Sequence, residues 1–224
     1  FSDKDFVNAL LFTLKITVVS VVTINLIAFI LAVLLTRGLK GSNLFRTVFF
    51  MPNLIGGIVL GYIWQIIINA ILSSAGVDIT VDAKYGFWGL IVLMNWQMIG
   101  YMMIIYIAGI QNVSEDLREA AAIDGATNFQ TLTRIVVPNI MPSVTICTFL
   151  TITNSFKLFD QNLALTGGSP GKQTTMLALD IYNTFYGRLG YEGVGQAKAV
   201  IFFLMVALVA FIQLRATRSK EVEN

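Results

Sequence analysis

The chain has 224 residues, of which 56% are hydrophobic and only 12% are charged, whereas a soluble domain carries roughly 25% charged residues. This composition excludes a soluble globular domain and a disordered chain. The absence of histidine excludes a histidine general base and the histidine zinc motifs, so we expect no metal site. The net charge of +2 is too small to indicate a nucleic-acid partner.

Five long stretches of the sequence contain no charged residue: 16–36, 47–77, 85–114, 135–156 and 199–214. A helix needs about 20 mostly apolar residues to cross a bilayer. In the first predicted span, 7–36, the hydroxyls of Thr13, Thr17 and Ser20 share one helical face and are expected to serve helix packing. We therefore predict an all-α membrane protein, a polytopic bundle of about five spans at 7–36, 46–72, 87–110, 139–165 and 197–214.

The basic residues between the spans predict the orientation. The segment 37–46 carries Arg37, Lys40 and Arg46 and no acid, and five spans would place it on the same side as the C-terminal tail. The positive-inside rule makes that side cytoplasmic, so the visible N-terminus is expected outside and the C-terminus inside. Because the sequence begins at Phe1 rather than Met, we also expect that an N-terminal helix is missing from it.

The longest charged interruption on the cytoplasmic side, residues 114–138, predicts two short helices joined at a glycine. Ser114 can cap the first helix, and Gly125 stands where a C′ glycine would end it. Thr127-x-x-Gln130 is a capping box that would begin the second helix.

We expect Pro138 to end this second helix. The small residues at 120–122 would let another backbone approach closely, which favours a docking element. An amphipathic helix lying on the membrane surface fits the same pattern.

One motif in this stretch is specific. Glu119-Ala120-Ala121, followed by Gly125, Ile135 and Pro138, resembles the EAA motif of ABC importer permeases, with Val137 in place of the usual leucine. We call residues 114–138 the EAA segment.

The resemblance extends over nearly the whole chain. Its other parts resemble carbohydrate importers of the maltose and glycerol-phosphate type, and in particular their first permease subunit. They are Phe45–Pro52, the residues Trp96, Gly100 and Ala108–Gln111, and Thr166–Pro170, where Ser169 replaces a glycine.

This resemblance implies a type I permease fold, one transmembrane domain over residues 1–224, in a bacterial-type cytoplasmic membrane. The EAA segment would be the coupling helix, seated in a groove of an ATPase subunit. The implied partners are two ATPase subunits, a second homologous permease and an extracytoplasmic solute-binding protein, with lipid around them. No cofactor would bind this chain, because ATP and Mg²⁺ would bind the ATPase. The implied coupling residues are Glu119, Ala120, Ala121, Asp124 and Gly125.

The expected outer loop, 166–196, begins with a near match to a phosphate-binding loop. Residues 166–174 contain Gly171-Lys172, but Thr166 and Gln173 stand where that motif needs a glycine and a serine or threonine. We therefore interpret the loop as a contact for the binding protein, made by Gly167, Gly168 and Pro170.

Polar residues inside spans are costly and usually face a cavity or a partner helix. Three spans carry such clusters, within 65–69, 95–101 and 154–162, at similar expected depths. Asp160 could pair with Lys157 three residues before it. Each side chain could instead bond to a neighbouring helix. The expected solute path comprises Gln65, Asn69, Asn95, Trp96, Gly100, Tyr101, Asn154, Ser155 and Lys157.

These observations predict the transmembrane subunit of an ATP-driven importer for a sugar or sugar-like solute, working by alternating access. The chain would not itself be an enzyme. A self-sufficient channel or secondary transporter is an alternative, as is a permease for another solute class. An intramembrane enzyme would need paired carboxylates or a metal cluster within the spans, and none is visible.

Overall fold

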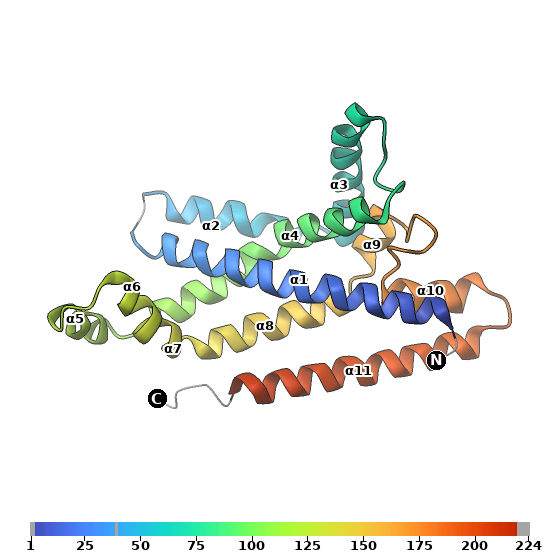
Figure 1. Ribbon diagram of the computed structural model, residues 1–224. Coiled ribbons are helices and arrows are strands. Elements are labelled where there is room, and N and C mark those ends of the chain that lie inside the picture. The colour runs from blue at the N-terminus through green and yellow to red at the C-terminus, as the bar shows by residue number, and fades with distance from the viewer. Residues whose placement is uncertain (1–2, 39, 219–224) are drawn as a thin grey trace.

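The computed structural model describes residues 3–38 and 40–218, and within these ranges every regular element is a helix (Figure 1). The order is α1 (Lys4–Leu35), α2 (Ser42–Phe50), the 3₁₀ turn η1 (Met51–Leu54), α3 (Gly57–Leu72), the 3₁₀ turn η2 (Ser73–Ala75), α4 (Ala83–Gln111), α5 (Glu115–Ile123), α6 (Asn128–Thr131), the π-helix η3 (Leu132–Val136), α7 (Val137–Asn139), α8 (Met141–Phe156), α9 (Asp160–Leu165), α10 (Leu177–Gly187) and α11 (Glu192–Arg218).

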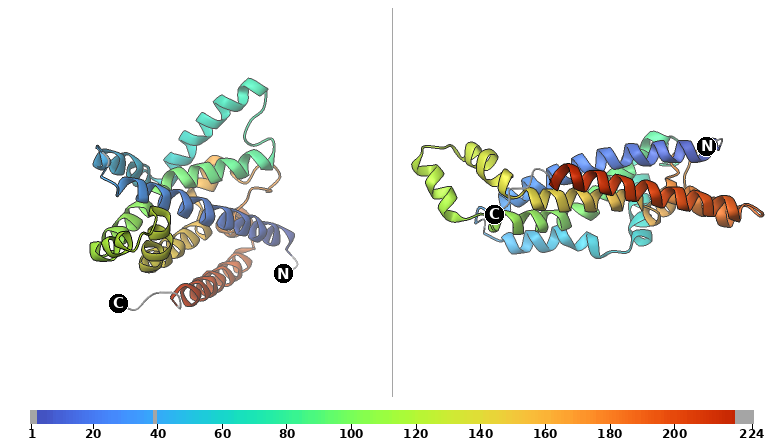
Figure 2. Two further views of the ribbon diagram at one scale, coloured as in Figure 1. Left: turned by 60° about the vertical axis from the view of Figure 1, so that its left-hand side comes forward. Right: turned by 90° about the horizontal axis from the view of Figure 1, so that it is seen from below.

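The long helices α1, α4, α8 and α11 lie with their axes roughly aligned, α8 running opposite to the other three, and form the body of a bundle (Figures 1 and 2). α5 to α7 project from one end, and α10 lies at the other. α3 leaves the bundle at a steep angle and returns to α4 through a loop. The chain begins at the α10 end and finishes toward the α5 end, as an odd number of crossings requires.

Four helices are long and apolar enough to cross a membrane: Lys4–Leu35, Gly57–Ala75, Ala83–Gln111 and Glu192–Ala216. A fifth candidate is a bent pair, Asn128–Asn139 with Met141–Phe156, whose parts meet at 69°. The prediction of about five spans is thus confirmed for the described ranges. The C-terminal tail beyond residue 218, which contributes to the predicted orientation, lies outside them.

α1 packs on α4 and α8 through a face of mostly small residues. The hydroxyls of Thr13 and Thr17 donate to the carbonyls of Ala9 and Thr13, each at 2.8 Å, so no polar group is left open on the buried face. Ser20 is also fully buried, against Met94 of α4. Within a bilayer the hydrophobic effect does not drive helices together, because lipid is as apolar as the side chains. Helices associate instead by close packing, which small residues allow. The expected packing role of these hydroxyls is confirmed.

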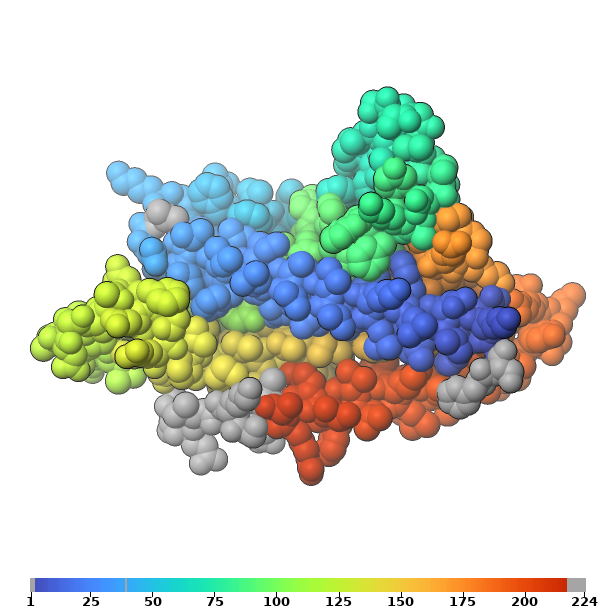
Figure 3. Space-filling model, viewed as in Figure 1, coloured from blue at the N-terminus to red at the C-terminus, as the bar shows by residue number. Residues whose placement is uncertain are grey.

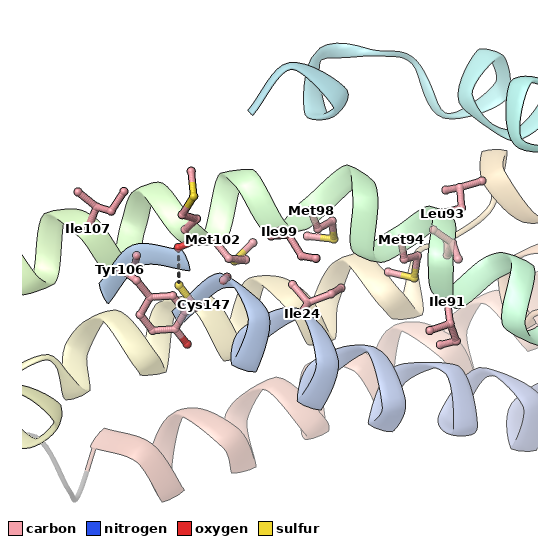
Figure 4. Packing of buried hydrophobic residues seen from close by; sticks show 14 of the residues in the cluster. Ile24, Ile91, Leu93, Met94, Met98, Ile99, Met102, Tyr106, Ile107 and Cys147 are labelled. Atoms are coloured by element: carbon pink, nitrogen blue, oxygen red, sulfur yellow. Dashed lines mark hydrogen bonds between the residues drawn. The ribbon is translucent and has the colours of Figure 1, made fainter. Parts of the chain in front are cut away.

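α4 is the central helix. Its buried residues occupy most of its circumference, as expected of a helix that is apolar all round. Its methionines, among them Met94, Met98 and Met102, fill the irregular space between α1 and α8 (Figure 4). Cys147 of α8 lies in the same cluster, its thiol 3.7 Å from the carbonyl oxygen of Met102.

Two of the predicted spans are not continuous helices. The stretch 46–72 is divided into α2, η1 and α3, with extended backbone at Ile55 and Gly56. The stretch 139–165 is divided into α8 and α9, with a break at 157–159. A long run of apolar residues predicts a membrane-embedded segment, but it does not predict whether that segment is one continuous helix. The expected outer loop 166–196 likewise contains a helix, α10.

Gly100 provides a test of how closely α4 and α2 approach. A Cβ added at Gly100 would overlap the backbone carbonyl of Phe49. Gly100→Ala should therefore force the two helices apart at a cost of about 1–3 kcal/mol, seen as a lower melting temperature in detergent. Gly56→Ala is the matched control, because its Cβ would meet nothing within 4 Å. Equal melting temperatures for the two variants would contradict the close approach.

Candidate functional site

The EAA segment forms a helical hairpin at one end of the bundle (Figure 1). α5 carries Glu115 and Asp116 in its first turn, where the helix dipole favours carboxylates. Ser114 occupies the N-cap position as predicted, although its hydroxyl makes no capping hydrogen bond.

The first helix ends at the predicted glycine. Gly125 has φ +77°, its N–H donates to the carbonyl of Ala122 at 3.1 Å, and the N–H of Ala126 donates to Ala121 at 2.9 Å. These two bonds are a Schellman motif, which needs a left-handed residue after the cap. The prediction that Gly125 ends this helix is confirmed.

The second helix begins with the predicted capping box. The N–H of Thr127 donates to Oε1 of Gln130 at 2.8 Å, and the N–H of Gln130 donates to Oγ1 of Thr127 at 3.3 Å. The prediction that Pro138 ends this helix is wrong. The chain widens into the π-helix η3, Pro138 then occupies the first turn of α7, and the bend falls at Ile140. A first-turn proline removes no needed hydrogen-bond donor, so it does not break the helix.

The five expected coupling residues differ in their exposure on the hairpin. Glu119, Ala120, Asp124 and Gly125 are exposed, whereas Ala121 is buried. All except Glu119 line a groove of about 490 Å³ between α5 and the second helix, together with Leu117, Ala126, Gln130, Arg134 and Ile135. Arg134 was not expected here, because only the fold of the hairpin places it opposite Asp124.

The hairpin is tied to α4 by one side chain. Nη2 of Arg118 in α5 donates to the carbonyl of Ile110 in the last turn of α4. A cation is favoured at this position because the helix C-terminus carries partial negative charge. Through this bond the hairpin is in direct contact with the central helix.

A second candidate site lies where the two broken spans face α4. This cavity of about 270 Å³ is lined by Asn53, Met94, Gln97, Met98, Tyr101, Asn154, Lys157, Leu158 and Gln161. We call it the polar cavity. Irregular backbone within a membrane is tolerated only where it is buried in protein or lines a cavity. The break at 157–159 meets this condition, because Lys157 and Leu158 line the polar cavity.

Gln97 connects the two breaks. Its side-chain amide nitrogen donates to the carbonyl of Ile55 at 3.5 Å, and its amide oxygen accepts from Nε2 of Gln161 at 2.8 Å. Asn53 donates to the backbone carbonyl of Gln97 at 3.5 Å. Gln97 and Gln161 belong to the predicted polar clusters at 95–101 and 154–162, although the expected path residues did not include them. Asn53 was in neither set, and its signal was its place beside Pro52 within an apolar stretch.

Three of the expected path residues, Tyr101, Asn154 and Lys157, line the polar cavity. The others do not line it. Four of them form hydrogen bonds within the protein: Gln65 with Leu165, Asn69 with Ile79, Asn95 with Thr23, and Ser155 with Thr151. Trp96 packs edge-on against Trp64, and Gly100 lies against α2.

Lys157 and Asp160 form no ion pair in the described part of the chain, contrary to expectation. α8 ends at Phe156, so the two residues do not share the continuous helix that an i, i+3 pair requires.

The loop expected to contact a binding protein is held by buried polar residues, among them Asn162 of α9. Its amide donates to the carbonyl of Thr174 at 2.8 Å and accepts from the N–H of Met176 at 2.9 Å. Gly167 is exposed, Gly168 is buried and Pro170 is partly buried. Lys172 of the near-match sequence pairs with Asp5 at 2.6 Å.

A buried ion cluster fastens α1, α10 and α11 at this end. Nζ of Lys198 lies 2.7 Å from Asp3 and 2.8 Å from Asp180, and it also bonds Oγ1 of Thr184. Only 6% of the Lys198 side chain and 8% of Asp180 are exposed. The hydrogen bond from Lys198 lowers the pKa of Asp3 below its ordinary value. The stabilisation from Asp3 is therefore present above that ordinary value and is lost as pH falls through the lowered pKa.

Lys198→Met should destabilise the protein strongly, by about 3–5 kcal/mol, because two carboxylates would face one another without their cation. Lys172→Met removes one of the two exposed partners of Asp5 and leaves Arg188 paired with it, so it should cost about 0–1 kcal/mol. Melting temperatures in detergent would check both. Similar losses for the two variants would show that the cluster is not a buried fastening.

Comparison with known proteins gives consistent matches. Residues 24–220 match the family described as binding-protein-dependent transport system inner membrane component. The chain is 45% identical to a probable starch degradation products transport system permease protein, AmyD, of Thermoanaerobacterium thermosulfurigenes, over 99% of this chain and 78% of AmyD. It is 30% identical to the multiple sugar-binding transport system permease protein MsmF of Streptococcus mutans, over 99% and 79% of the two chains.

Among solved structures, a bacterial ABC transporter involved in the import of the acidic polysaccharide alginate matches with a TM-score of 0.85. The match covers 98% of this chain and 81% of that one, at 20% sequence identity. The likeness is therefore one of fold, and it confirms the expected all-α permease architecture.

Proposed function

Because the chain belongs to the family of binding-protein-dependent transport system inner membrane components, we propose that it is the transmembrane subunit of an ATP-driven ABC importer for a sugar or sugar-like solute. As a member of this family it is a multi-pass membrane protein and a transport subunit rather than an enzyme. In the proposal, the visible N-terminus lies outside and the EAA segment in the cytoplasm.

The observation that carries the proposal is the exposed hairpin attached to the central helix. Glu119 and Ala120 are accessible to a partner, Gly125 ends α5 without side-chain bulk, and Arg118 ties α5 to α4. Such a hairpin can transmit the movement of a docked ATPase to the spans. ATP and Mg²⁺ bind the ATPase subunits, and their closure switches the polar cavity from inward-open to outward-open.

A second permease completes the pathway and supplies the other docking hairpin. In support, α3 leaves its own bundle and exposes large apolar side chains around much of its circumference, including Tyr62, Ile66 and Ile71, that need an apolar neighbour. A homologous chain would cover this helix, with lipid around both.

Two observations support a sugar as the solute: the side chains that line the polar cavity, and the relatives of this chain. The polar cavity offers amides from Asn53, Asn154 and Gln161, and amides pair well with sugar hydroxyls. The relatives AmyD and MsmF are described as permeases for starch degradation products and for multiple sugars. A solute-binding protein would deliver the sugar at the other end, against the loop around Gly167.

Gly125→Val should abolish solute uptake by the reconstituted transporter while membrane insertion is retained. Valine at this left-handed position costs about 1–2 kcal/mol and distorts the turn on which the docking helix ends. Gly41→Val is a matched control, since Gly41 also has positive φ and open space around it but lies outside the hairpin.

Wild-type uptake by Gly125→Val would overturn the coupling role of the hairpin. If uptake by the wild-type protein continued without any ATPase subunit, the chain would instead be a channel or secondary transporter.

Lys157→Met should raise the solute concentration needed for half-maximal uptake by about tenfold, which corresponds to the loss of one charged hydrogen bond. Lys157 lines the polar cavity, whereas Lys84 at the start of α4 does not, so Lys84→Met serves as the control. Uptake should be measured over a range of solute concentrations. An unchanged half-maximal concentration for Lys157→Met would remove this residue from the solute path.

A further inference from the structure

A cavity of about 430 Å³ lies at the end of the bundle that carries the EAA segment, and none of the roles described above uses it. Three parts of the chain meet there: the end of α1, the end of α4 and both helices of the hairpin. In Figure 3 the hairpin stands beyond the end of α1 on this side of the molecule. The lining residues are Val33, Thr36, Arg37, Ile110, Arg118, Asn128, Thr131, Leu132 and Val136.

The cavity is positively charged and has no counter-ion. Arg37 and Arg118 both line it, and no carboxylate does. Every ion pair among residues 3–38 and 40–218 lies at the opposite end, around Asp3 and Asp5. Nη2 of Arg118 is used by the carbonyl of Ile110, but its Nε is buried without a hydrogen-bond partner in the described chain. Two guanidinium groups therefore face one space that contains no anion from the protein.

The position and the walls of the cavity define its ligand. α1 ends at Leu35 and α4 at Gln111, so the cavity lies where hydrocarbon gives way to the headgroups of a bilayer. Guanidinium groups bind phosphate through paired hydrogen bonds. Val33, Leu132 and Val136 form an apolar wall beside them. Two of these wall residues, Leu132 and Val136, belong to the π-helix η3, a rare geometry that is frequent at functional sites.

We propose that this cavity binds a phosphate group, and that the headgroup of an anionic phospholipid supplies it. The site itself does not depend on the proposed orientation of the chain. The identity of the leaflet that supplies the lipid does, and that orientation makes it the cytoplasmic leaflet. The bound phosphate would bridge Arg37 at the end of α1 and Arg118 in α5, offsetting part of their charge. An anionic lipid would thus hold the EAA hairpin against the first span, and lipid composition would influence coupling.

The test uses the complete transporter reconstituted into nanodiscs of phosphatidylglycerol and phosphatidylcholine. After extraction into neutral detergent, the lipid retained by the protein is measured by mass spectrometry. The wild-type protein should retain phosphatidylglycerol in preference to phosphatidylcholine. Arg37→Gln, which breaks no hydrogen bond assigned in the structure, should lower this retention about fivefold or more. Lys40→Gln is the control, because Lys40 lies in the same basic segment but does not line the cavity.

The charge-retaining variant Arg118→Lys should keep the fold and lose part of the retention, because an ammonium group cannot form the paired bonds. A second arm adds inorganic phosphate, which should not displace the retained lipid. Displacement, together with a rise in melting temperature on adding phosphate in phosphatidylcholine discs, would overturn the lipid as the source. Equal retention by the wild type and Arg37→Gln, with no effect of phosphate on either melting temperature, would overturn the site. None of these measurements depends on transport, so they are independent of the proposed solute and ATPase.

Discussion

The absence of water inside a bilayer is the constraint on which this structure depends. Every backbone group freed by an interrupted helix must find a partner within the protein. The two interruptions, at Ile55–Gly56 and at 157–159, lie beside the same continuous helix, and Gln97 of α4 bonds to Ile55 at one and to Gln161 beyond the other. Gln97 and Gln161 also line the polar cavity, so the side chain that satisfies the first interruption belongs to the proposed solute site as well.

α4 connects this cavity to the hairpin. It is helical from Ala83 to Gln111, so Gln97 and Ile110 lie on one rigid element about 20 Å apart. Its packing on α1 uses small residues and hydroxyls bonded to their own helix, which leaves little room for relative sliding. In the proposed mechanism, a displacement at Arg118 would therefore be passed along α4. Gly100, held against α2, extends the same rigid contact to the first interruption.

The few charges of the chain are separated by role. At the α10 end they are paired and partly buried, with Lys198 between Asp3 and Asp180 fastening three helices. At the hairpin end Arg37 and Arg118 face an open cavity without a carboxylate. Buried paired charges hold a structure together, whereas unpaired cations at a membrane interface remain available to an anionic ligand. One end of the bundle is thus fastened by the chain itself, and the other is free to respond to a partner or a lipid.

The sequence by itself determined the features that depend on neighbouring residues. The charge-free stretches predicted the number of spans, because crossing a bilayer requires about 20 apolar residues in succession. The Schellman glycine Gly125 and the capping box at Thr127 were predictable because capping is local. Only the tertiary structure decided that Asn95 bonds to Thr23 while Asn154 and Lys157 face a cavity, and that Asn53 joins them. These assignments depend on where helices break and which faces meet, since a polar side chain in a span is satisfied equally well by a neighbouring helix or by a solute path.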